Sequence, residues 1–414
     1  MLPLLALLAC ARTCPEGTLD AEAWLASAPS TLAGEWAQFR LEPGHQGLAP
    51  AGSHVDAGLS LTWKSEAYAI GDYSASKGSP SVAGGAVYVG IDDGILRKLS
   101  LEDGRLLWSF ETRAAQEERE REDDENRGIH GTPAIVDGRV FIGAYDGWLY
   151  ALDEDDGSLL WERHLGGSIG ASPVVHGGLV FMAVEYGDPD GKVFVLDAEE
   201  GCTIYETPWL GDHPHSSATV DTTRGYLFIG ANNGRFAAFD FLEGAPVWEV
   251  WMDQGEDGDI KATAALDGDT VYITSWDHKL HAIDVDSGQE RFVFAADQDS
   301  MSSPAVHQGV AWFGSHDGQV YAIDADPDAA YDDDQDRLLW AHGTGGKVLS
   351  SPTVVPDAGV LLVGSNDSTL SMLGMEDGAL WWEQTLDGRV SSVPVVVGGT
   401  VLATDSSGAT WRWD

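Results

Sequence analysis

The chain has 414 residues, and its 67 acidic and 23 basic residues give a formal net charge of −44 at pH 7. This charge argues strongly against nucleic-acid binding, which depends on basic residues that neutralise phosphates, and it also disfavours anionic lipid surfaces. Hydrophobic residues make up 43 % of the chain, which is enough to build a core. The 50 glycines and 16 tryptophans indicate many short strands joined by tight turns.

The amino terminus has the features of an export signal. Residues 2–9 form an apolar run that is too short to span a bilayer, and the segment Leu7-Leu8-Ala9-Cys10 resembles the lipobox of bacterial lipoproteins. No Lys or Arg precedes the run, which departs from the usual charged start of a signal peptide. The sequence therefore predicts a signal and lipobox region over residues 1–14, with lipidation at Cys10. Membrane contact is expected only through that anchor.

The remaining cysteines fit an exported protein. Cys14 and Cys202 are available for a disulfide bond in an oxidising compartment, although their distance in sequence leaves the pairing open. The sequence has no C-x-x-C motif and no Cys/His spacing typical of a metal site.

One sequence pattern, A-x-D-x-x-x-G-x-x-x-W, recurs along the chain. Its clearest copy runs from Ala151 through Asp153 and Gly157 to Trp161. The Asp position of the copies, 40 to 53 residues apart, is occupied by Ser100, Asp153, Asp197, Asp240, Asp284, Asp324, Gly374 and Asp414. In the sixth copy, an eight-residue insertion delays the aromatic residue to Trp340. A fixed period of this length indicates a repeat architecture.

Each repeat is predicted to contain four short strands. In the second repeat the expected strands are residues 132–136, 139–143, 148–152 and 159–162, and Asp137-Gly138 supplies a hairpin turn between the first two. Four strands in about 40–45 residues is typical of one blade of a β-propeller.

Counting the repeats predicts an all-β, eight-bladed β-propeller of four-stranded blades over residues 59–414, preceded by a leader segment over residues 15–58. The eighth repeat ends after its third strand, at Asp414. Residues 59–63 form the missing strand, so the N-terminal strand is expected to complete the last blade and close the ring. Closure removes the exposed sheet edges that favour aggregation.

The repeat is similar to the PQQ-enzyme repeat, also called the tryptophan-docking motif, of the quinoprotein alcohol dehydrogenase-like superfamily. Residues 35–40 (EWAQFR) and 44–47 (GHQG) resemble the leader of this superfamily, and the resemblance covers roughly residues 34–414. The repeated aromatic residue is interpreted as a wedge between neighbouring blades, the glycine as a corner, and the Asp as a cap for turn amides. The docking aromatics are Trp63, Trp108, Trp161, Tyr205, Trp248, Phe292, Trp340 and Trp382.

The resemblance leaves three functional classes open. It favours the non-catalytic branch, which includes outer-membrane assembly lipoproteins of the BamB type, because the chain lacks the vicinal Cys-Cys pair and the C-x-x-C-H motif of several dehydrogenases. This implies a monomeric scaffold without a cofactor, at the periplasmic face of the outer membrane or the cell surface. Its partner would be an envelope protein such as the barrel-assembly machinery. The alternatives are a quinoprotein-type protein that binds PQQ or another anion, and a calcium-dependent surface protein.

Basic residues are scarce, yet several precede the inner strands. Lys77, His130, His215 and Lys261 stand three places before the Pro of a Ser/Thr-Pro pair or its equivalent. In the other copies this place is taken by Gly170, Met301, Leu349 and, if Val393 occupies the Pro position, Val390. Inner strands begin at the mouth of a propeller channel, so these residues are expected to form a ring that binds a carboxylate or phosphate. The alternative is that they pair with neighbouring acids.

Two acidic insertions and one histidine pair depart from the repeat. Residues 111–127 alternate acidic and basic side chains and predict a solvated, helical excursion, or a partner-binding loop. The loop that carries Asp324, Asp326, Asp328 and Asp332 has the oxygen-rich spacing of a calcium loop. It lacks the glycine and glutamate of an EF-hand, and a solvated acidic loop is the alternative. His213 and His215 form a local pair on a predicted loop, where a metal role is the minor interpretation.

Overall fold

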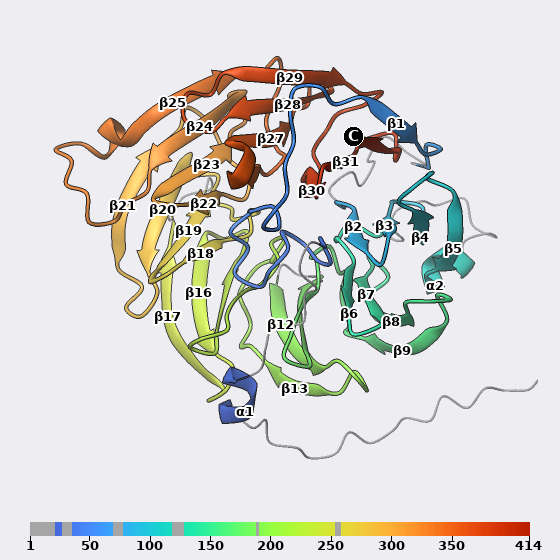
Figure 1. Cartoon of the computed structure of the whole chain (residues 1–414). Helices are drawn as coiled ribbons and strands as arrows, with labels where there is room; N and C mark the ends of the chain where they lie inside the picture. Colours follow the sequence, from blue (N-terminus) through green and yellow to red (C-terminus); the bar gives the residue numbers. More distant parts are fainter. Residues whose placement is uncertain (1–20, 27–34, 69–77, 118–127, 188–189, 253–257) are drawn as a thin grey trace, which may run out of the picture.

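The computed structural model describes residues 21–26, 35–68, 78–117, 128–187, 190–252 and 258–414. These residues form eight four-stranded antiparallel sheets arranged as blades around a central channel (Figure 1), which confirms the predicted eight-bladed propeller. Within each blade, consecutive strands pair with their neighbours, except in the blade that joins the two ends of the fold.

Each blade has an inner strand beside the channel, two middle strands and an outer strand. The inner strands are β2 (Ser81–Ala83), β6 (Ala134–Val136), β10 (Val174–His176), β14 (Thr219–Asp221), β18 (Ala265–Asp267), β22 (Ala305–His307), β26 (Thr353–Val355) and β30 (Val395–Val397). The second strands are β3 (Ala86–Gly90), β7 (Arg139–Gly143), β11 (Leu179–Tyr186), β15 (Tyr226–Gly230), β19 (Thr270–Thr274), β23 (Val310–Gly314), β27 (Val360–Gly364) and β31 (Thr400–Thr404). The third strands are β4 (Ile95–Ser100), β8 (Trp148–Asp153), β12 (Asp190–Asp197), β16 (Arg235–Asp240), β20 (Lys279–Asp284), β24 (Gln319–Asp324), β28 (Thr369–Gly374) and β32 (Thr410–Trp413). The outer strands are β5 (Leu106–Glu111), β9 (Leu159–His164), β13 (Thr203–Glu206), β17 (Ala245–Trp251), β21 (Glu290–Ala295), β25 (Leu338–Gly343), β29 (Leu380–Thr385) and β1 (Leu61–Lys64).

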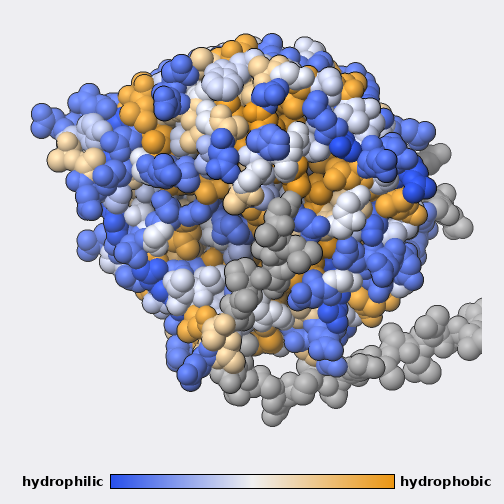
Figure 2. Space-filling view, in the orientation of Figure 1, coloured by the Kyte–Doolittle hydropathy of each residue, from blue (hydrophilic) through white to orange (hydrophobic). Residues whose placement is uncertain are grey.

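The described helical segments are short: α1 (Ala21–Leu25), α2 (Arg113–Glu117), η2 (Asp334–Arg337) and η3 (Pro356–Ala358). The segment α2 lies where the sequence predicted a helical excursion, and residues 118–127 of that excursion are outside the described part of the chain. In the described residues, no helix has both the length and the apolar composition needed to cross a membrane. Hydrophilic residues cover much of the face shown in Figure 2, with apolar patches between them.

The ring closes as predicted, because β1 completes the last blade. It pairs antiparallel with β32, with Trp63 opposite Arg412 and Lys64 opposite Trp411. Just outside the strand, the Ser60 and Asp414 backbones exchange hydrogen bonds of 2.9 and 3.1 Å. The first strand and the last strand of the fold are therefore held in one sheet, which removes a free edge from the ring.

Most of the docking tryptophans join one blade to the next. Five of them donate their indole Nε1–H to a backbone carbonyl of the following blade, one residue after the repeated Asp position. The pairs are Trp63–Leu101 (2.9 Å), Trp108–Glu154 (3.1 Å), Trp161–Ala198 (3.1 Å), Trp248–Val285 (2.7 Å) and Trp340–Met375 (2.9 Å). Each ring also lies against the corner glycine of that blade. A Cβ built on Gly157 would stand 2.7 Å from the Trp108 ring.

The sixth blade receives a tyrosine bond in place of the indole bond, because the equivalent carbonyl, Ala325 O, accepts from the Tyr272 hydroxyl of the preceding blade at 2.9 Å. The outer strand before it carries Phe292, which has no N–H to donate. The guanidinium of Arg337, 3.7 Å from the centre of the Phe292 ring, donates to the carbonyls of Asp324 and Asp326. The eight-residue insertion therefore places a buried cation against the phenylalanine ring that takes the tryptophan position.

The leader crosses the channel and bonds to the inner strands in order around the ring. In seven of the eight blades, counted over the described residues, the N–H two places after the Pro position donates to the leader. The bonds are Val82–Trp36 O (2.7 Å), Ile135–Ala37 O (2.6 Å), Val175–Gln38 Oε1 (3.0 Å), Val220–Pro43 O (2.9 Å), Leu266–Gly44 O (2.8 Å), Val306–Gln46 O (3.0 Å) and Val354–Gly47 O (2.9 Å). At the eighth blade, His54 N donates to the carbonyl of Gly398 at 2.7 Å.

Polar side chains of the leader reinforce this arrangement. Arg40 is fully buried and donates from Nη2 to Pro304 O at 2.6 Å, and burial lowers its pKa to about 9. His45 reaches Phe39 O and Ala218 O, each at 3.1 Å, and burial lowers its pKa to about 3. The carboxylate of Glu42 accepts from the amides of Gly44 and Gln46. The leader is thus a plug fixed across one end of the channel.

The corner glycines allow a controlled test of blade docking. Gly157 and Gly244 have nearly the same left-handed backbone, with φ of 72° and 69°. A Cβ on Gly157 meets Trp108 at 2.7 Å, whereas a Cβ on Gly244 stands 3.8 Å from Tyr205. Both substitutions to Ala should cost about 1–2 kcal/mol for the left-handed backbone. Gly157→Ala should lose about 1–3 kcal/mol more through overpacking, as measured by denaturant unfolding. Equal losses in the two variants would contradict the docking contact.

Candidate functional site

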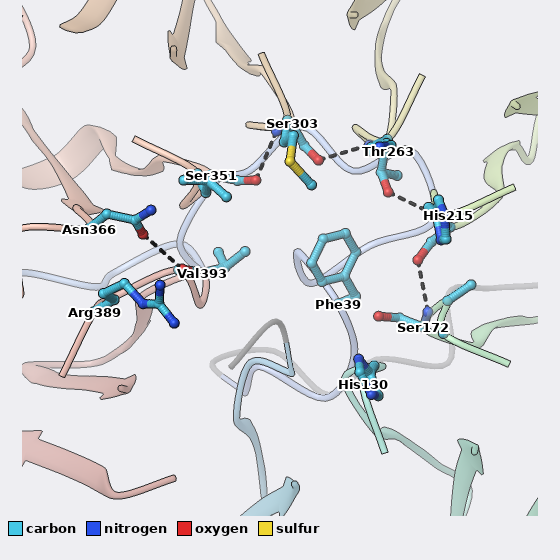
Figure 3. A pocket seen from close by; sticks show the side chains of 17 residues that line it. Phe39, His130, Ser172, His215, Thr263, Ser303, Ser351, Asn366, Arg389 and Val393 are labelled. Carbon is cyan, nitrogen blue, oxygen red and sulfur yellow. Dashed lines mark hydrogen bonds between the residues drawn. The ribbon is translucent and has the colours of Figure 1, made fainter. Parts of the chain in front are cut away.

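A cavity of about 280 Å³ occupies the channel above the plug, and among the described residues its lining comes from the leader and the starts of seven inner strands. Figure 3 shows Phe39 of the leader at the centre, surrounded by His130, His215, Arg389 and a set of small hydroxyl side chains. We call this cavity the funnel. Along each inner strand, the funnel lining precedes the Pro position and the plug contacts follow it, so the leader forms the floor of the funnel.

The structure brings the predicted ring positions together around the funnel. His130, His215 and Lys261 line it, as do their equivalents Gly170, Met301 and Leu349. Lys77 lies outside the described residues. The eighth position was assigned wrongly from the sequence. Pro394 takes the Pro place, so the equivalent residue is Ser391, which lines the funnel, while Val390 is buried in the core.

Below the residues at the ring positions, a belt of hydroxyl side chains links neighbouring blades. In the described residues, seven backbone N–H groups donate to a Ser or Thr hydroxyl of an adjacent blade, with donor–acceptor distances of 2.8–3.1 Å. The hydroxyl acceptors are Ser79, Thr132, Ser172, Ser217, Thr263, Ser303 and Ser351. Val393 holds the eighth place and offers no hydroxyl, although its own N–H donates to Ser79 Oγ. The belt explains why Ser or Thr precedes Pro in most repeats.

The basic groups of the funnel are partly neutralised by acids. Lys261 pairs with Asp259 at 3.2 Å and lies 3.4 Å from the centre of the Trp276 ring. His215 pairs with Glu185 at 3.2 Å. Arg389 lines the funnel, and its guanidinium has no hydrogen bond or ion pair to another described residue. Of the cations that line the funnel, Arg389 is therefore the one best placed to meet an anion from outside.

The acidic loop after β24 is organised by internal hydrogen bonds. Asp324 accepts from the Asp326 amide, and Asp326 accepts from the Asp328 amide, each at 2.9 Å. Tyr331 donates to the second oxygen of Asp324 at 2.6 Å. Asp332 is exposed nearby in the loop. Calcium binding by Asp324, Asp326, Asp328 and Asp332 stays a prediction.

A different set of side chains converges beside the funnel. Glu185, His213 and His215 each offer one ligand atom within 4.8 Å of the other two, and they form the one such group among the residues that the structure describes. Sequence reasoning singled out the two histidines but missed Glu185. The signal was present in β11, which runs eight residues where most second strands run five, and which carries an acid near its end.

The export features are placed only in part. Cys10 and Cys14 lie outside the described residues, so lipidation at Cys10 stays a prediction. Cys202 is disulfide-bonded, and its pairing with Cys14 stays a prediction as well because the partner is not among the described residues.

Comparisons with known proteins identify the family. The family model described as "Outer membrane protein assembly factor BamB" matches residues 121–327 and 329–414, which is more than half of the chain. The chain belongs to this family. Among its relatives, the outer membrane protein assembly factor BamB of Xanthomonas campestris is 27 % identical over 339 residues, covering 80 % of this chain and 79 % of the relative. The BamB of Escherichia coli K12 is 24 % identical, covering 80 % of this chain and 83 % of the relative.

Solved structures agree on the fold. BamB from Moraxella catarrhalis has a TM-score of 0.65 at 21 % identity, covering 86 % of this chain and 97 % of that one. A quinohemoprotein alcohol dehydrogenase from Pseudomonas putida has a TM-score of 0.72 at 15 % identity, covering 92 % of this chain and 80 % of that one. The two therefore share one architecture with this BamB-family chain, and the likeness to these structures shows the fold alone.

Proposed function

We propose that this BamB-family protein is a non-catalytic scaffold in outer-membrane protein assembly, held at the periplasmic face of the outer membrane by lipid on Cys10. The observation that carries the proposal is the family match over residues 121–327 and 329–414, together with relatives named as BamB that are covered over most of their length. Its partner would belong to the barrel-assembly machinery, and the protein would act without a cofactor.

The funnel supports a scaffold better than a cofactor-dependent enzyme. Its floor is occupied by Phe39 and the leader, and its volume of about 280 Å³ is at the lower limit for pockets that enclose a drug-sized ligand. Two of its cations are already paired, Lys261 with Asp259 and His215 with Glu185. The outer strands, in contrast, present exposed leucines and tryptophans to solvent, including Leu106, Leu159 and Trp381.

Deletion of the gene in its own host tests the scaffold role. We expect the amount of folded β-barrel protein in outer membranes to fall, because assembly loses a supporting partner. Re-expression of the chain should restore it, and quantitative proteomics with heat-modifiability of the barrels gives the readout. Cys10→Ser should shift the protein from membrane to soluble periplasmic fractions, whereas Cys14→Ser should leave it attached. Unchanged barrel levels after deletion would overturn the proposal.

A quinoprotein-type ligand binder is the second candidate. The observation that favours it is that the Arg389 guanidinium lines the funnel without a hydrogen bond or ion pair to another described residue. Thermal unfolding of the purified chain with PQQ, with calcium and with both separates the classes. A ligand present at about 100 times its Kd stabilises the native state by about 2.7 kcal/mol, so a specific complex would be visible. We expect no shift with any of the three.

A saturable rise with PQQ that Arg389→Gln abolishes would contradict the non-catalytic assignment. A rise with calcium alone would instead support a calcium-dependent surface protein, and Asp326→Asn with Asp328→Asn would then locate the site.

A further inference from the structure

A buried carboxylate and two imidazoles meet at the edge of the funnel, between the third and fourth blades. Glu185 lies near the end of β11, and His213 and His215 lie in the segment that leads to β14. The side chain of Glu185 is only 7 % exposed. Its one side-chain hydrogen-bond partner among the described residues is His215 Nδ1, at 3.2 Å. A buried carboxylate with so little compensation favours the approach of a cation.

The hydrogen bond of His213 prepares its ring for metal binding. Its Nε2 lies 2.6 Å from the carbonyl oxygen of Tyr186, and a carbonyl can only accept, so Nε2 carries the proton. The lone pair is then on Nδ1. At metal sites a histidine usually donates its non-ligating ring N–H to a backbone carbonyl, a carboxylate or water, which fixes the tautomer and the ring orientation and leaves the other nitrogen for the metal.

The spacing of the donors fits a small divalent ion. Zinc binds histidine nitrogen and carboxylate oxygen at about 2.0–2.1 Å, so two ligands of a tetrahedral ion lie about 3.4 Å apart. His215 Nδ1 and Glu185 Oε1 are 3.2 Å apart, and all three ligand atoms lie within 4.8 Å of one another. A metal ion can therefore take the place of the proton in the hydrogen bond between His215 and Glu185. Only a small movement of His213, the third ligand, is then needed.

The surrounding backbone leaves room for this carboxylate. Position 170 in the ring is a glycine, and a Cβ built there would stand 2.8 Å from Glu185 Oε1 and 3.1 Å from the Tyr145 hydroxyl. Gly170 and His215 both line the funnel, so the cluster borders the same cavity.

We propose that Glu185, His213 and His215 form a binding site for a divalent transition-metal ion of the zinc type at the edge of the funnel. Three protein ligands leave the fourth position of a tetrahedral ion for water or for a donor group of a bound partner. The site is independent of the scaffold role, which stands or falls on barrel assembly.

A second His₂-carboxylate set in the chain provides the matched control. His278 bonds to Asp299 Oδ1 at 2.9 Å, and His316 faces Asp299 Oδ2 at 3.4 Å. These histidines take opposite oxygens of the carboxylate, and in the described residues this set does not converge as Glu185, His213 and His215 do.

The test is zinc titration by calorimetry of the purified chain without a histidine tag, with cobalt(II) absorption to report tetrahedral coordination. We expect one equivalent of zinc to bind. His213→Ala and His215→Ala each remove a ligand. They should weaken zinc binding by more than the roughly 10–100-fold that is lost when a residue that only orients a ligand is removed. Gly170→Ala, which keeps all three ligands but displaces the carboxylate, should weaken it about tenfold. His278→Ala should leave the affinity within about twofold of the parent.

Far-ultraviolet circular dichroism of each metal-free variant checks folding. If an alanine variant does not fold, Glu185→Gln, which keeps the side-chain shape and removes the charge, replaces it and should also weaken zinc binding. The proposal is overturned if the parent chain binds no zinc, or if the folded variants at positions 185, 213 and 215 bind it as tightly as the parent.

Discussion

The inner strands of a propeller carry backbone N–H groups that face the channel and have no strand to pair with, and the structure depends on how these groups are satisfied. An unpaired buried N–H costs about 1–3 kcal/mol. In this chain the leader supplies the hydrogen-bond acceptors as one continuous segment. It accepts from one inner-strand N–H group in each of the first seven blades, from Val82 in the first to Val354 in the seventh. The leader therefore acts as a shared edge for the whole ring rather than as a tail attached to one blade.

The same arrangement determines what the funnel can do. The plug closes the channel at the level of Phe39, the hydroxyl belt holds the blades together above it, and the ring positions remain at the open end. The result is a cavity of about 280 Å³ whose chemistry depends on a few side chains at its rim. The fold is shared with a quinohemoprotein alcohol dehydrogenase, so the blades by themselves do not decide the function of a BamB-family chain.

The sequence predicted the blades well because each repeat has a strong local signal. Turn glycines and strand alternation gave residues 139–143 and 159–162, and the structure has β7 over Arg139–Gly143 and β9 over Leu159–His164. Ring positions were predictable wherever a Ser or Thr hydroxyl marked the register. The eighth was misplaced because Val393 lacks the hydroxyl that marks the other repeats. The contact of Glu185 with His215 joins two residues that lie 30 positions apart in the sequence and belong to different blades. The path of the leader depends on backbone geometry. Neither feature could therefore be predicted from local sequence patterns.

Hydrogen exchange of the inner-strand amides tests the central role of the leader most directly. The amides of Val82, Val220 and Val354 face the channel, and the bonds to Trp36, Pro43 and Gly47 should protect them to the same degree as amides in the middle strands. We expect slow exchange at these three positions in the native chain, measured by mass spectrometry or nuclear magnetic resonance. Rapid exchange there, with the middle strands still protected, would show that the leader does not pair with the ring and would contradict the account.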